Sequence, residues 1–431
     1  MANSSADQID TRLTARQKIW RPKPRPDWVQ KIIQEGSYMD IANLVPLDEE
    51  SLIETAKRNT GLRDFGDDNW REPFGILVRD LEEHARLHLM GRIMTRADLL
   101  IHLEARLQIQ EAYKQYPEID DEEVDGLFYI IGQGRSGTSL LQNIMSADPA
   151  NGTTMGWEIM YPCPPPTQEN YHSDERIAKA DHIIGTLNRV VPELASMHEF
   201  GAKIPTECIQ LHCLTFISPW LLSFGGQAPN YAAYLQTADM EAVYRYEKRV
   251  LKLLQWKNPR QRWVMKSPAC IMHIPEILKV YPDVKFIWPH RDPVKALASV
   301  VNLLGTLYWS RSDHPFIGDS MAMFTNPEIS AFNLCRPIEL LESGVLPESQ
   351  LYNLQYLDLV ADPVQAVLNI YHYFDVTAEA ESGQALREYM QANPRNKHSA
   401  HSYVLGDSEN IAMERQAYQK YQQYFSVQNE I

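Results

Sequence analysis

Disulfide and membrane patterns are missing from this sequence. Only five of its 431 residues are cysteine and none forms a C-x-x-C pair, so we expect reduced thiols and neither a disulfide framework nor a zinc site. The longest apolar run, residues 214–224, contains Pro219 and is too short to cross a bilayer. The first 17 residues contain no apolar signal core. These absences predict a cytoplasmic protein without a membrane span.

Positive charge is also scarce. The chain has 41 Lys and Arg residues against 56 Asp and Glu, a formal net charge of −15. A nucleic-acid or anionic-membrane surface needs a basic field, so we expect no nucleic-acid partner. The hydrophobic content of 44% predicts a packed globular core. An acidic chain that binds an anion must concentrate its basic side chains at the site.

The stretch from Leu127 to Met145, LFYIIGQGRSGTSLLQNIM, contains the strongest local pattern. Residues 127–131 form an apolar run typical of a buried strand, and apolar residues recur at helical spacing from Thr138 onward. The turn between them, GQGRSG, has three glycines. Glycines allow backbone N–H groups to converge on an anion, and a helix N-terminus adds partial positive charge. The stretch therefore predicts a phosphate-binding turn between a strand and a helix.

This turn differs from the phosphate loop of nucleoside triphosphatases, G-x-x-x-x-G-K-[ST]. Thr138 replaces the lysine, and a basic residue, Arg135, stands earlier in the turn. The change indicates a loop that holds a terminal phosphate without a metal-bound triphosphate, and we expect no metal ion. A tyrosine-phosphatase loop would need cysteine where Tyr129 stands. The alternative is an ordinary strand–turn–helix with an incidental arginine, because short motifs also occur by chance.

A second basic motif follows another predicted strand. Residues 284–288 (VKFIW) form an apolar run, and His290-Arg291-Asp292-Pro293 then precedes a helical pattern. Arg291 at the strand end and Ser299 in the helix can both reach one phosphate, through a planar fork and a hydroxyl. Predicted strands and helices alternate over residues 262–305, which favours a parallel sheet.

Together these motifs resemble the sulfotransferases that use 3′-phosphoadenosine 5′-phosphosulfate (PAPS). The glycine turn resembles their 5′-phosphosulfate loop, Arg291 with Ser299 their 3′-phosphate pair, and W-V-M-K-S-P at 263–268 the strand between them. The chain is most similar to the bacterial branch of large soluble enzymes with a helical N-terminal extension, over about residues 60–410. The residues that would bind the donor are Arg135, Ser136, Gly137, Thr138, Ser139, Arg291 and Ser299.

The resemblance implies a P-loop-like α/β fold with a central parallel sheet flanked by helices. Residues 1–125 would form an N-terminal arm and helical extension packed on the core, and residues 126–431 the sulfotransferase domain. In the extension, Thr95 with Asp98 three residues later is typical of a helix N-cap. His84 and His88 lack the H-E-x-x-H pattern and are expected to be solvated helix residues. The implied partners are PAPS, its product 3′-phosphoadenosine 5′-phosphate (PAP) and a small hydroxyl acceptor, with a homodimer left open.

Roles in sulfuryl transfer also follow from the resemblance. The reaction is an in-line displacement in which positioning and charge stabilisation dominate. Lys266 would neutralise the oxygen that bridges sulfur and phosphorus, and Arg135 would face the leaving phosphate. A late basic cluster with Arg395 and Lys397, which follows the turn-forming Asn393-Pro394, would fold over the nucleotide.

Three residues compete for the role of proton acceptor. Relatives carry histidine at two positions that here hold Pro268 and Cys270. Glu158 stands where other branches have a glutamate soon after the phosphate-loop helix, and apolar neighbours would raise its pKa toward neutrality. We therefore predict Glu158 as the base. The reserve candidates are His198 and Glu207.

Two other functions stay open from the sequence. A phosphoryl-transfer enzyme or nucleotidase would want the loop lysine and an acidic metal ligand, for which Asp292 is the only near candidate. A non-catalytic nucleotide-binding protein could share the fold. The acceptor itself is not identified, because the aromatic residues in 195–235 and 305–325 predict an apolar pocket or, equally well, a core.

Overall fold

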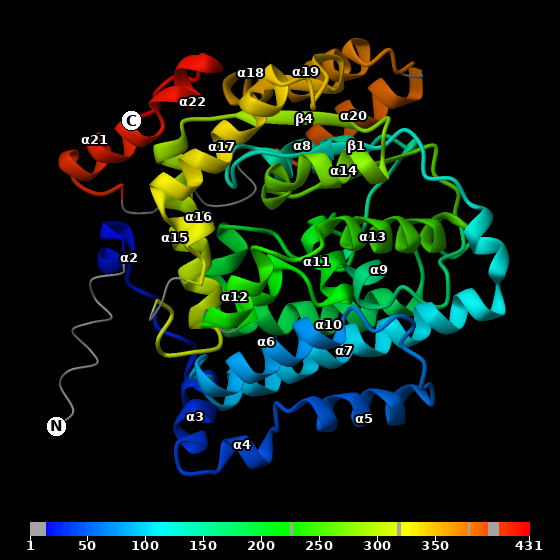
Figure 1. The fold of residues 1–431 in the computed structure, drawn as a ribbon, viewed down its shortest axis with the longest axis vertical. Helices are drawn as coiled ribbons and strands as arrows, with labels where there is room; N and C mark the ends of the chain where they lie inside the picture. The colour runs from blue at the N-terminus through cyan, green and yellow to red at the C-terminus, as the bar shows by residue number, and fades with distance from the viewer. Residues whose placement is uncertain (1–13, 225–226, 317–319, 378–379, 395–404) are drawn as a thin grey trace.

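The protein is built on a five-stranded sheet, whose strands β1 and β4 lie in the upper part of Figure 1. The computed structural model describes residues 14–224, 227–316, 320–377, 380–394 and 405–431. The strand order is β2-β3-β1-β4-β5, and every neighbouring pair is parallel. This topology confirms the expected α/β class. The strands are β1 Phe128–Ile130, β2 Asn151–Gly152, β3 Arg262–Lys266, β4 Lys285–His290 and β5 Leu351–Gln355.

Alternating side chains of β1 divide the core into two layers. Phe128 and Ile130 pack with apolar residues of α8, α19 and α20 on one face of the sheet. Tyr129 packs with residues of α13, α14 and α15 on the other. The sheet is therefore covered on both faces, as parallel sheets usually are. These helices are α8 Thr138–Met145, α13 Met240–Gln255, α14 Ile274–Val280, α15 Pro293–Trp309, α19 Pro363–Tyr373 and α20 Ala380–Ala392.

The N-terminal helices lie together at one end of the molecule, far from α18–α20 (Figure 1). The longest of them, α7, packs against α5 and contacts α9 and η3 of the following region. Buried residues such as Leu52, Phe74 and Leu103 belong to the same apolar cluster as Tyr129. The extension therefore shares its core with the sheet. Its helices are α3 Asp27–Gly36, α4 Ile41–Leu44, α5 Glu49–Thr60, α6 Arg71–Glu83 and α7 Leu89–Gln115.

The described part of the N-terminal arm is docked by buried polar contacts. Helix α2 (Ala15–Ile19) packs on α15. Arg16 Nε donates to Glu414 Oε1 of α21 at 2.7 Å, and both side chains are buried. Trp20 Nε1 donates to Asn302 Oδ1 at 2.9 Å. These bonds tie residues 14–20 to α21 and to α15, the helix that follows β4.

The other elements of the described chain complete the layers. No helix among these residues combines the length and apolar character needed to cross a membrane. The remaining α-helices are α9 Gly156–Met160, α10 Glu175–Val190, α11 Cys208–His212, α12 Pro229–Leu235, α16 Ala322–Thr325, α17 Pro327–Glu342, α18 Tyr356–Ala361, α21 Ser408–Ala417 and α22 Gln419–Tyr424. The short 3-10 helices are η1 Pro117–Asp121, η2 Pro192–Ser196, η3 Cys213–Thr215, η4 Pro219–Phe224, η5 Pro268–His273 and η6 Glu348–Gln350.

Two expectations in the extension are wrong. Thr95 is not an N-cap: it lies inside α7 and donates from Oγ1 to the Phe224 carbonyl at 3.2 Å. The cap of α7 is His88, whose Nδ1 accepts the Gly91 N–H at 2.9 Å, so His88 is buried and not solvated. His84 ends α6 instead of sharing a helix with His88.

Candidate active site

The glycine turn joins β1 to α8 with a backbone that few residues tolerate. Gly132, Arg135 and Gly137 have φ values of +127°, +71° and +93°. A Cβ at Gly132 would lie 2.7 Å from Trp288 Cδ1, so the turn packs too closely against β4 for any side chain there. Helix α8 begins directly after Gly137 without a side-chain cap. Its first N–H groups are therefore available to an anion in the turn.

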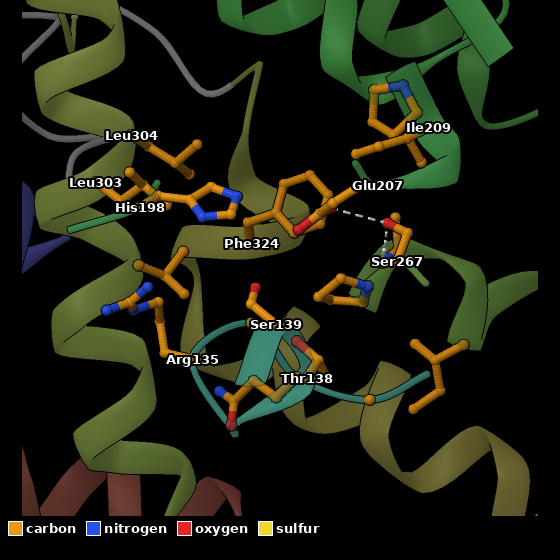
Figure 2. A pocket seen from close by; sticks show the side chains of 18 of the residues that line it. Arg135, Thr138, Ser139, His198, Glu207, Ile209, Ser267, Leu303, Leu304 and Phe324 are labelled. Carbon is orange, nitrogen blue, oxygen red and sulfur yellow. Dashed lines mark hydrogen bonds between the residues drawn. The ribbon is translucent and has the colours of Figure 1, made fainter. Parts of the chain in front are cut away.

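A cavity of about 320 Å³ lies against this turn. Thr138 and Ser139 line its floor, and apolar side chains of α15 and α16 line its walls, among them Leu304 and Phe324. Figure 2 shows Ser139 directed into the space between His198 and Ser267. Ser136 is fully buried and its Oγ donates to the Gln133 carbonyl at 2.7 Å, so its hydroxyl supports the turn. The cavity thus combines a polar floor with apolar walls.

Lys266 connects the turn to a carboxylate. It is the last residue of β3, and its side chain is 1% exposed. Its Nζ donates to Ser139 Oγ at 3.3 Å and to Glu207 Oε1 at 2.8 Å. Glu207 Oε2 also accepts from Ser267 Oγ at 3.1 Å (Figure 2). Burial raises the pKa of Glu207, but the cation of Lys266 and the hydrogen bonds outweigh burial and lower the pKa below its ordinary value.

His198 lies across the cavity from Ser267 (Figure 2). It follows η2 and packs against Phe200, with ring centroids 4.4 Å apart and ring planes tilted by 60°. Burial, followed by the nearby Lys266 cation, lowers the pKa of His198 to about 3, although Glu207 opposes this shift. The imidazole is therefore neutral near pH 7 and available as a hydrogen-bond acceptor.

Arg135, Arg291 and Ser299 come together beside the turn. Arg135 Nε donates to Ser299 Oγ at 2.9 Å, and Arg291 Nη1 donates to the Arg135 carbonyl at 2.7 Å. The Arg291 guanidinium also lies 4.1 Å from the centroid of the Tyr356 ring. The structure thus joins Arg135, predicted to face the 5′-phosphosulfate, and Arg291 with Ser299, predicted to bind the 3′-phosphate, in one hydrogen-bonded cluster. Arg395 and Lys397 lie outside the described residues.

Glu158 is not brought to this cavity. Its Oε2 accepts the Met155 N–H at 2.9 Å at the start of α9, and its Oε1 lies 3.5 Å from Arg260 Nη2. The side chain is fully buried and lines neither this cavity nor a second cavity that adjoins it. Burial raises the pKa of Glu158, while Arg260 opposes the shift. The start of α9 and the partly buried Arg260 are therefore the polar neighbours of this carboxylate.

A second cavity of about 280 Å³ adjoins the first. Its walls come largely from α7, α9 and α10, including Met94, Ile101 and Ile184. The two cavities share a set of wall residues, so they are separated by single side chains. The shared residues are His198, Phe200, Trp220, Ser223 and Leu307. Sequence reasoning missed the contribution of α7 to this cavity.

Two of the cysteines are neighbours in space. Cys208 Sγ and Cys270 Sγ are 3.3 Å apart behind β1, and both are buried. Cys208, His212 and Glu247 also have potential ligand atoms within 4.8 Å of one another. These atoms already bond within the group: Glu247 Oε2 lies 2.8 Å from His212 Nε2 and 3.0 Å from Tyr129 Oη. Cys208 and Cys270 are free thiols.

Comparison with known proteins decides the family. A model described as Sulfotransferase family matches residues 128–380. The chain belongs to the sulfotransferase family. This confirms the family expected from the motifs, and the match includes the glycine turn, Lys266 and Arg291.

Several similar proteins come from mycobacteria. Stf3 of Mycobacterium tuberculosis and of Mycobacterium bovis, named as omega-hydroxy-beta-dihydromenaquinone-9 sulfotransferase, is 25% identical over 260 residues. That segment covers 58% of this chain and 62% of the relative, so the match spans less than two thirds of the curated protein. Two crystal structures are also similar. They are STF9 from Mycobacterium avium (25% identical, 89% of this chain and 98% of the other, TM-score 0.76) and STF1 from Mycobacterium tuberculosis (27%, 86% and 97%, 0.71).

Proposed function

We propose that this protein transfers the sulfuryl group of PAPS to a hydroxyl of an apolar acceptor. The observation that carries the proposal is the Lys266 ammonium, which lies between Ser139 of the glycine turn and the Glu207 carboxylate. A cation beside the phosphate cradle can stabilise the leaving oxygen, and a carboxylate beside the cation can accept a proton. Membership of the sulfotransferase family supports this reaction class.

The donor would be held by two groups of residues. Thr138 and Ser139 in the first turn of α8, with Arg135 of the glycine turn, would bind the 5′-phosphosulfate, because the start of α8 and Arg135 line the same cavity. Arg291 and Ser299 would bind the 3′-phosphate. Each residue keeps the role that the motif pattern predicted for it.

The reaction would proceed by one displacement. The acceptor oxygen forms a bond to sulfur as the bond between sulfur and the phosphate oxygen breaks, and PAP leaves with that oxygen. We assign the proton of the acceptor hydroxyl to Glu207 and not to Glu158. When Lys266 turns to the negative charge on the leaving oxygen, its effect on Glu207 weakens, and burial then raises the pKa of Glu207. The carboxylate becomes a better base as the leaving group develops charge.

The acceptor would occupy the apolar part of the two cavities. Phe200, Trp220 and Leu307 line both, and the second cavity leads from them to α7. Apolar walls favour a hydrophobic acceptor that presents its hydroxyl to His198 and Glu207. The name of Stf3 describes a hydroxylated menaquinone as its acceptor, which is an acceptor of this kind. A homodimer and a cytoplasmic location stay predictions.

A metal-dependent phosphotransferase is less well supported. Its candidate ligand, Asp292, accepts the Val294 N–H at 3.1 Å at the start of α15. It also pairs with Arg415 at 2.7 Å. Its oxygens therefore have structural partners away from the glycine turn.

The test compares two matched substitutions, Glu207→Gln and Glu158→Gln. Each removes a proton acceptor and keeps the shape of the side chain. We expect Glu207→Gln to lower turnover by about 10²-fold or more with PAP affinity near wild type. Glu158→Gln should keep turnover per folded molecule and lower the thermal midpoint. Turnover would be followed with sulfur-labelled PAPS and a series of apolar alcohols. If turnover were lost in Glu158→Gln but not in Glu207→Gln, the role of base would return to Glu158.

A further inference from the structure

Glu430 lies against cations beside the proposed 3′-phosphate site, 139 positions after Arg291. Its Oε1 accepts from Arg291 Nε at 2.7 Å, and its Oε2 accepts from Arg291 Nη2 at 3.1 Å. Oε2 also lies 3.0 Å from Lys295 Nζ. The exposed fraction is 15% for the Arg291 and Glu430 side chains and 28% for Lys295. The carboxylate therefore bridges two mostly buried cations.

The contact of Glu430 involves Arg291, the side chain proposed to bind the 3′-phosphate of the donor. Lys295 and Ser299 are four residues apart and lie on the same side of α15, and Arg291 stands two residues before this helix begins. Ser299 is joined to the same cluster through Arg135. A guanidinium binds the paired oxygens of a carboxylate and of a phosphate with the same planar fork. Glu430 thus presents to Arg291 the kind of group that a 3′-phosphate would present.

The segment that carries Glu430 is held independently of its carboxylate. The Glu430 N–H donates to Asp292 Oδ2 at 2.7 Å, and Asp292 is paired with Arg415 of α21. Gln422 of α22 donates to the Val427 carbonyl at 3.2 Å, and Val427 is buried. Because backbone and neighbouring side chains position the segment, a change of the carboxylate alone should leave it in place.

We propose that Glu430 is an internal ligand of the 3′-phosphate subsite, which holds Arg291 and Lys295 when no donor is bound and is displaced by the 3′-phosphate. The proposal rests on the proposed function, since it takes Arg291 to be part of the donor site. The carboxylate and the phosphate are both anions and compete for the same cations. The apparent Kd for a 3′-phosphorylated nucleotide is then the intrinsic Kd divided by the fraction of protein with Glu430 displaced. Glu430 would weaken PAP binding and so promote product release.

Calorimetry with PAP and with adenosine 5′-phosphate (AMP) tests the competition. Glu430→Gln should bind PAP about tenfold more tightly than wild type, the factor expected if Glu430 is displaced in roughly one molecule in ten. AMP affinity should not change, because AMP has no 3′-phosphate. Glu409→Gln in α21 is the matched control: it removes one exposed negative charge near the same end of the chain and should change neither affinity.

The outcomes separate this proposal from the proposed function. Unchanged or weaker PAP binding by Glu430→Gln overturns it; weaker binding would mean that Glu430 orients Arg291 for the phosphate. If the wild type and Arg291→Gln both bind PAP no more tightly than AMP, the subsite assignment itself fails. Thermal unfolding would verify that each variant is folded. If Glu430→Gln does not fold, Glu430→Asp takes its place, because its shorter side chain reaches Arg291 less well. Glu430→Asp should bind PAP more tightly than wild type by a smaller factor, and unchanged PAP affinity would refute the proposal.

Discussion

Replacement of Lys266 by methionine should destabilise the protein in a pH-dependent way. The Lys266 side chain is 1% exposed and its Nζ lies 2.8 Å from Glu207 Oε1, with Glu207 17% exposed. Methionine fills similar volume but leaves a mostly buried carboxylate without its cation. Breaking such a pair typically costs about 3–5 kcal/mol. We expect a loss near the lower end of that range, because Ser267 Oγ still donates to Glu207.

The sign of the pH dependence follows from the pKa of Glu207. In the wild type this pKa is lowered, so its stabilisation is present above the unfolded pKa and is lost as pH falls through the folded pKa. Without Lys266, burial raises the pKa of Glu207 above its unfolded value. The variant is then least penalised at low pH and loses stability as pH rises through the raised pKa. The stability deficit of Lys266→Met should therefore be larger at about pH 8 than at about pH 5.

Urea unfolding followed by circular dichroism at both pH values measures this deficit. The double variant Lys266→Met/Glu207→Gln is the control: it has no unpaired carboxylate, so its deficit should be smaller and nearly independent of pH. An equal deficit of Lys266→Met at the two pH values would refute the reasoning. So would a double variant no more stable than Lys266→Met at the higher pH. Turnover of Lys266→Met should fall by about 10²-fold or more through loss of charge stabilisation.

Three further predictions concern the donor. The wild type should bind PAP about 10- to 100-fold more tightly than AMP, because charge-assisted contacts of Arg291 are each worth about 1.5–3 kcal/mol; equal affinities in calorimetry would contradict this. Sulfuryl transfer should persist in a chelator without added metal, and activity that disappears with chelator and returns with magnesium would count decisively against it. Lys397→Ala, at a position outside the described residues, should weaken PAP binding and reduce its salt dependence. Unchanged affinity and salt dependence would show that the basic cluster does not cover the nucleotide.

Much of the scaffold could be predicted from neighbouring residues alone. The predicted helix from Thr138 to Met145 has the bounds of α8, and the strand before Arg291 appears as β4 followed by α15. Apolar periodicity and glycine backbone freedom act within a few residues, so they can be read directly from the order of amino acids. The two-residue strand β2 was missed because it is too short to carry a period.

The arrangement of the candidate site depended mostly on contacts between distant segments. Glu158 was chosen for its distance from the glycine turn, but its oxygens bond to Met155 and approach Arg260. Glu207 pairs with Lys266 across 59 positions of the chain. The adjacent thiols of Cys208 and Cys270 are 62 positions apart. No local pattern encodes which of several buried polar side chains will share a cavity wall.

The sequence by itself therefore determined the class of fold, the glycine turn between a strand and a helix, and the family, because these depend on residue types at short and regular spacing. Only the tertiary structure decided which carboxylate lies beside Lys266, that α7 helps to form a second cavity, and that Glu430 holds Arg291. The physical reason is that burial and charge pairing are properties of packed surfaces. A carboxylate becomes a base candidate, or an internal ligand, only when a folded cavity places a particular cation and a particular wall around it.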